Sequence, residues 1–210
     1  MARQLRKPSG SAGHQTGLMM NKANEQLYRH TINVMKPATG DQLLEIGFGN
    51  GKFFGEVFQS APDLHITGID YSALMVNEAA KDNQLWIDEG KLRLVQGNSD
   101  QMPFDENSFD KIFCINVVYF WDDAAAHLQE IKRVLKPCGR FYATIRTKKS
   151  MELMPFTNYN FTKYDESDWQ TLVNKNGLQY LQAFTIDEPE TTFRGETFRI
   201  QSICLVAAKP

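Results

Sequence analysis

The chain has 210 residues, a formal net charge of −2 at pH 7, and a composition of 42% hydrophobic and 23% charged residues. This length and composition are typical of one globular domain and exclude a disordered chain. The near-zero charge excludes a surface-wide attraction to nucleic acid or to an anionic membrane. No apolar stretch reaches the ~18 residues that span a bilayer, so we expect no membrane insertion and no nucleic-acid partner.

The first residues, MARQLRKPSGSAGHQTG, are rich in glycine, serine and basic residues and lack the apolar centre of a secretory signal. We predict that residues 1–17 form a flexible arm. The three cysteines, Cys114, Cys138 and Cys204, lie far apart and show no metal-ligand spacing. They indicate reduced thiols in a cytoplasmic protein, and the sequence predicts no metal site.

Apolar residues at helical spacing, including Leu27 and Tyr28, predict a helix over residues 18–36, which Pro37 ends. Strands and helices that alternate over residues 42–147 then predict a mostly parallel sheet with helices on both faces. The predicted strands are Leu43–Ile46, Ile66–Ile69, Leu92–Val95, Ile112–Val118 and Phe141–Ile145. The predicted helices between them are Lys52–Gln59, Ala73–Asn83 with Ser72 as N-cap, and Asp122–Leu135, which Pro137-Cys138-Gly139 closes.

The pattern changes after Arg146. Residues 147–164 follow no clear period and contain four aromatic residues, and a capped helix follows at Glu166–Asn176. Two apolar runs come last, Leu178–Ile186 and Ser202–Ala208, with the turn-rich TTFRGET between them. We predict that these two runs pair as an antiparallel hairpin at the edge of the sheet.

The turn after the first predicted strand reads GFGNG, with Gly47, Gly49 and Gly51 at alternate positions. Backbone without a Cβ lets a ligand approach closely. In open α/β sheets, ligands bind at this place, outside the carboxyl ends of the strands. A purely structural tight turn is the alternative interpretation.

Two acidic residues narrow the kind of ligand. Asp70 ends the second predicted strand, where a carboxylate can accept hydrogen bonds from both ribose hydroxyls of a nucleoside; a strand-end cap is the alternative. Glu45 lies two residues before the first glycine, where a carboxylate suits a cationic ligand better than a pyrophosphate. A dinucleotide site has the spacing G-x-G-x-x-G, whereas the third glycine here comes one residue early. The pattern favours an adenosyl ligand that carries an amino acid.

The segment EIGFGNG resembles the glycine-rich motif of class I S-adenosylmethionine-dependent methyltransferases. Four later segments are similar to motifs of the same family, in the same order: QGNSDQMPF, FDKIFCINVVYFWDD, LKPCGRFY and YDESDWQTLVNKNGL. The small-molecule enzymes related to those of ubiquinone and menaquinone biosynthesis are the subgroup that the chain most resembles. The resemblance implies S-adenosylmethionine as cofactor. It also implies a Rossmann-like, doubly wound, mostly parallel seven-stranded sheet with an antiparallel C-terminal hairpin and an N-terminal helical lid.

The resemblance also implies roles for single residues. It implies that Glu45 faces the cofactor's ammonium, that Asp70 binds the ribose and that Tyr71 packs on the adenine. Asn98 stands where relatives commonly have aspartate, and its amide still offers an acceptor to the adenine. The full set of expected cofactor contacts is Glu45, Gly47, Gly49, Gly51, Asp70, Tyr71, Asn98, Ser99 and Asn116.

The acceptor side is less defined. Relatives often carry a His pair where this chain has Tyr119 and Phe120, so no obvious general base is present. Methyl transfer needs none when the acceptor is already a good nucleophile. Tyr28 is expected to line the acceptor pocket, because its helix covers the cofactor in relatives, and Tyr119 suits substrate contact and packing equally. Arg146 suits either an anionic substrate or a surface salt bridge.

The sequence therefore predicts a single domain, residues 1–210, with the arm, a lid helix at 18–36, a cofactor-binding core at 42–147, and a substrate-side segment with the final strands at 148–210. The predicted activity is methyl transfer from S-adenosylmethionine to an unidentified small molecule by in-line displacement. A non-catalytic protein that binds this cofactor or its demethylated product and acts through a partner is the alternative. An aminopropyl transferase is a further one. Residues 18–36 and 147–164 are expected to fold over the crevice as a lid with aromatic residues facing the acceptor.

Overall fold

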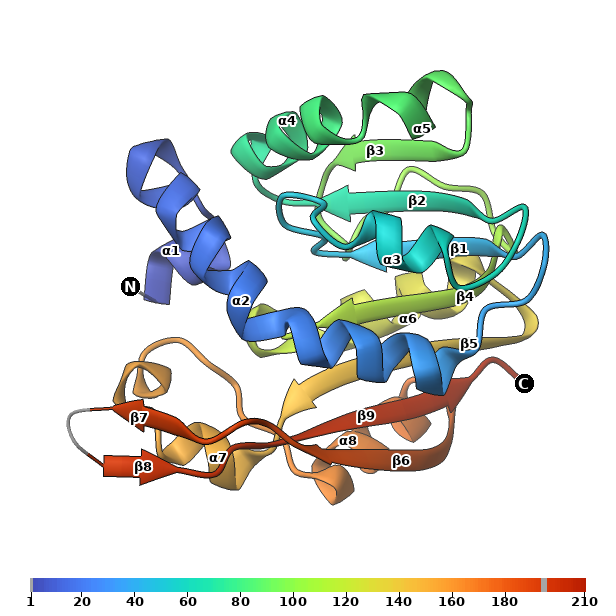
Figure 1. Ribbon diagram of the computed structural model, residues 1–210. Helices are drawn as coiled ribbons and strands as arrows, with labels where there is room; N and C mark the ends of the chain where they lie inside the picture. The colour runs from blue at the N-terminus through green and yellow to red at the C-terminus, as the bar shows by residue number, and fades with distance from the viewer. Residues whose placement is uncertain (1, 194–195) are drawn as a thin grey trace.

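The computed structural model describes residues 2–193 and 196–210. Its centre is a seven-stranded sheet in the order β3-β2-β1-β4-β5-β9-β6 (Figure 1). The first five strands along the chain are parallel to one another, which confirms the mostly parallel sheet. The strands are β1 (Gln42–Ile46), β2 (His65–Asp70), β3 (Leu92–Gln96), β4 (Phe109–Ile115), β5 (Leu135–Arg146), β6 (Gln179–Asp187) and β9 (Gln201–Ala208).

The C-terminal strands pair as predicted, because β9 is antiparallel to both β5 and β6. β9 lies inside the sheet and is almost wholly buried, whereas β6 forms the edge and is mostly exposed or half-buried. Between them, β7 (Thr191–Phe193) and β8 (Glu196–Phe198) pair as a separate two-stranded sheet. The turn predicted within TTFRGET falls partly on residues 194–195, which lie outside the described residues.

Helices cover both faces of the sheet, as the alternating pattern predicts. One apolar cluster joins the strands to α2 (Gly10–Met35), α3 (Phe54–Phe58), α4 (Ala73–Asp82) and α5 (Gln84–Asp88). The other joins them to α6 (Ala124–Val134) and α8 (Glu166–Lys175). Each helix turns large apolar side chains inward, such as Phe54 of α3 and Trp169 of α8, both fully buried. The sheet is thereby held between two helical layers.

The prediction of a flexible arm over residues 1–17 is wrong. Ala2–Arg6 form α1, and α2 begins at Gly10, well before residue 18. Glycine and serine are poor helix formers, so tertiary contacts must supply the stability. The Ser72 hydroxyl donates to the carbonyl of Pro8 at 2.7 Å. Gly13 packs so closely that a Cβ there would lie 2.9 Å from Leu74.

Parts of three later segments also differ from the sequence-based expectation. β4 ends at Ile115, because Asn116 has a left-handed φ of 58° and turns the chain out of the sheet. β5 already begins at Leu135, so Pro137-Cys138-Gly139 lies in a strand instead of closing the preceding helix; β5 and β4 pair irregularly beside it. Residues 147–164 contain a short helix, α7 (Lys148–Glu152), and one 3-10 turn at Pro155–Asn158.

Several of these additional elements gather at one end of the sheet. Figure 1 shows α1, the start of α2, α7 and the β7–β8 hairpin beyond the carboxyl ends of the parallel strands. In an open α/β fold this end carries the ligand site. Within the described ranges, no helix is both long enough and apolar enough to cross a membrane.

Candidate active site

A cavity of about 1160 Å³ opens at the carboxyl ends of the parallel strands. Asp70, Gly47, Asn116 and Arg146 line it, from the ends of the neighbouring strands β2, β1, β4 and β5. These four strand ends cover three interstrand steps, about 14 Å. Pockets for one small ligand usually measure about 300–1,000 Å³, so this cavity is larger than a usual pocket for one small ligand.

The glycine turn contains both packed and open positions. Gly47, Gly49 and Gly51 have φ values of 73°, 58° and 70°, in the left-handed region that favours glycine. A Cβ on Gly47 would lie 2.4 Å from Val117, and one on Gly51 would lie 2.8 Å from Ala79. A Cβ on Gly49 would meet no atom within 4 Å, and Gly49 lines the cavity whereas Gly51 does not. Gly49 is thus the glycine of this turn that leaves bare backbone facing the open cavity.

Alanine substitutions should separate these two roles. Gly49→Ala and Gly51→Ala share the strain of a left-handed alanine, about 1–2 kcal/mol. Gly51→Ala adds overpacking of about 1–3 kcal/mol, so its melting temperature should fall further. Calorimetry with S-adenosylhomocysteine, the demethylated form of the expected cofactor, should show the greater loss of affinity for Gly49→Ala, whose methyl group faces the cavity. Wild-type affinity in Gly49→Ala would contradict the ligand role of this turn.

Asp70 holds the turn and also lines the cavity. Its Oδ2 accepts a hydrogen bond from the Gly49 amide at 2.9 Å, and its Oδ1 accepts one from the Ser72 amide at 2.8 Å. Burial raises the pKa of Asp70 to about 6, and the hydrogen bonds from the two backbone amides oppose that rise. Each carboxylate oxygen has a second lone pair, so Asp70 can accept hydrogen bonds from two hydroxyls in addition to those from the two backbone amides.

The residues expected near the adenine also border the cavity. Tyr71 is 47% exposed, and the ammonium of Lys7 lies 4.0 Å from the centre of its ring. Asn98 donates its amide hydrogen to Asp100 at 2.9 Å, which leaves the Asn98 carbonyl oxygen as the acceptor that the sequence predicted. Tyr71, Asn98 and Asp100 line the cavity, whereas Lys7 does not.

His127 joins this part of the wall, which the sequence did not predict. Its Nδ1 lies 2.7 Å from the Ser99 hydroxyl, and its ring stacks on Trp121 with the centres 4.7 Å apart. Burial lowers the pKa of His127, so the neutral ring is favoured. Helical spacing could have placed it correctly, because His127 shares the buried face of α6 with Ile131.

Glu45 does not reach the cavity wall. Its side chain is 2% exposed, and its Oε1 accepts a hydrogen bond from the hydroxyl of Tyr28 at 2.5 Å. Burial raises the pKa of Glu45 to about 8; the Tyr28 hydrogen bond lowers it, and the charge of Asp70 raises it. Tyr28 itself lines the cavity. The sequence predicts that Glu45 faces the cofactor's ammonium, whereas its carboxylate here faces Tyr28.

A chain of polar contacts connects α2 to the ends of β4 and β5. Asn116 donates to the side-chain oxygen of Asn24 at 2.9 Å, and the Tyr119 hydroxyl donates to Asn116 at 2.9 Å. The Tyr119 oxygen accepts from the backbone amide of Arg146. Burial raises the pKa of Tyr119, so its hydroxyl stays protonated. These contacts give Tyr119 a structural role, although its ring still borders the cavity.

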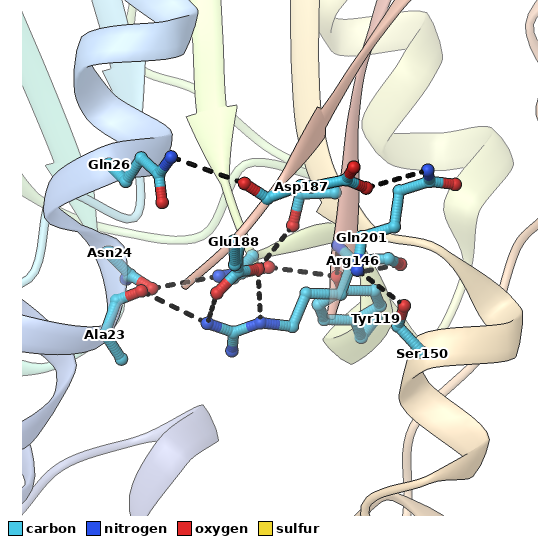
Figure 2. Close-up of polar contacts among 11 residues, drawn as sticks. Ala23, Asn24, Gln26, Tyr119, Arg146, Ser150, Asp187, Glu188 and Gln201 are labelled. Carbon is cyan, nitrogen blue, oxygen red and sulfur yellow. Dashed lines mark hydrogen bonds and ion pairs between the residues drawn. The ribbon is translucent and has the colours of Figure 1, made fainter. Parts of the chain in front are cut away.

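Arg146 is paired with a residue that the sequence did not single out. Figure 2 shows its guanidinium against Glu188, with Nε to Oε1 at 2.9 Å and Nη2 to Oε2 at 2.8 Å. Nη2 also donates to the carbonyl of Ala23 in α2 at 3.1 Å, and the Ser202 hydroxyl donates to Glu188 at 2.6 Å. The two charged side chains are only 16% and 8% exposed. Arg146 thus forms a buried, mutually neutralised ion pair at the cavity wall.

Most of the remaining wall on this side is apolar. Phe161 lies between Phe120 and Phe156, with ring centres 4.8 and 6.0 Å away. All three rings line the cavity, together with Met151 and Met154, whereas Tyr159 is 69% exposed and does not. The predicted lid segments, α2 and residues 147–164, therefore both contribute to the cavity wall. Their closure over a bound ligand stays a prediction.

Comparison with known proteins gives the family. A family model described as a methyltransferase domain matches residues 44–143. The uncharacterized methyltransferase YdaC of Bacillus subtilis is 31% identical over 134 residues, which cover 64% of this chain and 72% of YdaC. A Haloferax volcanii protein described as a methyltransferase, solved with the Trm112 methyltransferase activator, has a TM-score of 0.74 at 20% identity and covers 91% of this chain and 94% of its own. A geranyl diphosphate methyltransferase solved with geranyl diphosphate and sinefungin has a TM-score of 0.71 at 16% identity, over 89% of this chain and 79% of its own.

The chain belongs to the class I S-adenosylmethionine-dependent methyltransferases, as the glycine motif and its partner segments predicted. Its Rossmann-like sheet is the fold of the solved relatives. The cofactor is S-adenosylmethionine, of which sinefungin is an analogue. The narrower relation to enzymes of ubiquinone and menaquinone biosynthesis stays a prediction.

Proposed function

We propose that the protein transfers the methyl group of S-adenosylmethionine, by in-line displacement, to a neutral and largely apolar small molecule. One observation carries this proposal: a single cavity has two contrasting regions. At the ends of β1 and β2 it presents the bare backbone of Gly49 and the carboxylate of Asp70. Beyond β4 and β5 it presents aromatic rings and methionine side chains.

The first region suits the cofactor. Asp70 would accept hydrogen bonds from the ribose hydroxyls, and Gly49 would let the amino-acid part approach the backbone. Tyr71, Asn98 and Ser99 would border the adenine. When bound, the cofactor supplies a methyl carbon that its positive sulfonium makes electrophilic.

The second region positions the acceptor without offering it a base. Three carboxyl or phenol groups of this wall already have partners: Glu188 accepts from Arg146 and Ser202, Tyr119 accepts from the Arg146 amide, and Glu190 pairs with Arg199. We infer that the acceptor atom is nucleophilic on arrival. The protein's contribution is then to align the acceptor with the methyl carbon and to exclude water.

The charge of this wall supports a neutral acceptor. An anionic group would have to compete with Glu188 for a guanidinium that is already bound through two nitrogens. Phe120, Phe156 and Phe161 offer rings for packing against an apolar or planar molecule.

The acceptor class can be tested by product analysis. The protein is incubated with methyl-labelled S-adenosylmethionine and a metabolite extract that has been separated by charge and polarity. We expect label in small molecules of the neutral, apolar fraction. Label confined to anionic or strongly polar compounds would contradict the proposed acceptor class, and label in protein or nucleic acid would contradict a small-molecule acceptor.

A further inference from the structure

Tyr28 stands between a buried carboxylate and the cavity. Its hydroxyl donates to Glu45 at 2.5 Å, and its ring stacks on Phe53 with the centres 4.0 Å apart. Tyr28 and Phe53 both line the cavity, whereas Glu45 does not. The stacked ring and the hydrogen bond together fix where the phenolic oxygen lies. A ligand in the cavity therefore meets Tyr28 and not the Glu45 carboxylate.

The direction of this hydrogen bond decides what Tyr28 can offer a ligand. A phenol has one proton and two lone pairs on its oxygen. Because the proton points to Glu45, the lone pairs are available for an incoming donor. An ammonium group carries three donors and no acceptor, so it matches this oxygen. The negative charge of Glu45 would strengthen both hydrogen bonds of such a chain.

We propose that Tyr28 is the residue that accepts a hydrogen bond from the cofactor's ammonium, and that Glu45 acts on the cofactor only through Tyr28. Tyr28 is then a binding residue, and Glu45 is a positioning residue that orients and polarises it. The proposal rests on the cofactor occupying the glycine-turn region as proposed above. It also makes α2, which carries Tyr28, part of the site that recognises the amino-acid end of the cofactor.

The pH dependence of binding follows from the surroundings of Glu45. The groups that face Glu45 are Tyr28 from α2, Asp70 from β2 and Cys114 from β4. With its pKa raised to about 8, Glu45 is mostly protonated at pH 6 and ionised above pH 8. Since the ionised form favours the ammonium, affinity should rise from pH 6 to about 8 and then level off. Because Glu45 acts on the ligand only through Tyr28, Tyr28→Phe should abolish this rise.

Two ligands that differ only at the amino-acid end provide the test. S-adenosylhomocysteine has the ammonium, whereas 5′-methylthioadenosine keeps the adenosine and thioether but lacks the amino-acid end. Calorimetry would compare wild type, Tyr28→Phe, Glu45→Gln and the double variant from pH 6 to 8.5. Tyr164→Phe removes a hydroxyl from a buried tyrosine that does not line the cavity, and it serves as the matched control. The ratio of the two affinities cancels titrations such as that of Asp70, which affect the adenosine end.

Tyr28→Phe should lower the affinity for S-adenosylhomocysteine about tenfold or more at pH 7, since it removes a hydrogen bond to the charged ammonium. The affinity of Tyr28→Phe for 5′-methylthioadenosine should stay within about twofold of the wild-type value. If Glu45 acts only through Tyr28, the double variant should bind no more weakly than Tyr28→Phe alone. Glu45→Gln should abolish the rise in affinity between pH 6 and 8. This last result does not depend on the folding of Tyr28→Phe.

Two results would overturn the proposal. One is Tyr28→Phe binding S-adenosylhomocysteine as wild type does. The other is a double variant whose loss is the product of the two single losses, since that would show independent contacts. If the wild-type protein bound neither ligand, the cofactor assignment itself would fail, and the proposal for Tyr28 would fail with it.

Discussion

Glu188→Ala is expected to destabilise the folded protein by about 3–5 kcal/mol, because it leaves the Arg146 guanidinium buried without its partner. For a chain of this size the melting temperature should fall on the order of 10 °C. The substitution also removes the acceptor of the Ser202 hydroxyl and loosens the link from Arg146 to α2 through Ala23. Thermal or denaturant unfolding would measure the loss.

Two comparisons make this test specific. Glu190→Ala breaks the ion pair with Arg199, whose side chains are 62% and 69% exposed, and it should change stability by less than about 1 kcal/mol. The double variant Arg146→Met with Glu188→Leu removes both buried charges and should recover much of the loss. If Glu188→Ala were no less stable than Glu190→Ala, the Arg146–Glu188 pair would not stabilise the packing of α2 against the final strands.

Asp70→Ala is expected to have the largest effect on cofactor binding. It removes the charged acceptor proposed for the ribose hydroxyls, a loss of about 1.5–3 kcal/mol, or roughly 10- to 150-fold in affinity. It also removes the acceptor of the Gly49 amide, so the glycine turn loses an anchor and the loss should fall at the upper end. Calorimetry with S-adenosylhomocysteine would measure it.

The control for Asp70→Ala is an aspartate that also ends a secondary-structure element but does not border the cavity. Asp88 at the end of α5 is exposed and bonded to Gln84, so Asp88→Ala should bind the ligand as wild type does. Asp70→Asn should also bind weakly, because its amide hydrogens would face the Gly49 or Ser72 amide. Unchanged affinity in a folded Asp70→Ala protein would remove Asp70 from the site.

The cofactor end of the site could be predicted because its residues are set by local chain geometry. Gly47 and Gly49 lie in the turn that follows β1, and Asp70 is the last residue of β2, so a short apolar run that ends in a turn already places them at one end of a parallel sheet. The sequence could not tell that Gly49 alone faces open space. That difference depends on Val117 and Ala79, which approach from other parts of the chain.

The acceptor end could not be predicted in the same way, because its contacts join distant segments. Arg146 and Glu188 are 42 residues apart, and their pairing requires the final strands to be in place. One contact beside the glycine turn depends on distant segments in the same way, because the Tyr28 hydroxyl reaches Glu45 only once α2 has packed on the sheet. The helical start of the chain was missed for a related reason, since poor helix formers there are held by contacts with Ser72 and Leu74.

The most direct test of the central claim is whether the protein turns over its cofactor. Methyl-labelled S-adenosylmethionine, the protein and an unfractionated metabolite extract are mixed, and labelled small-molecule product and S-adenosylhomocysteine are counted together over time. We predict that both form in equal amounts and exceed the amount of protein many times, with little of either in Asp70→Ala. Tight binding of the cofactor with no S-adenosylhomocysteine formed in any extract would contradict catalysis and indicate a binding protein instead.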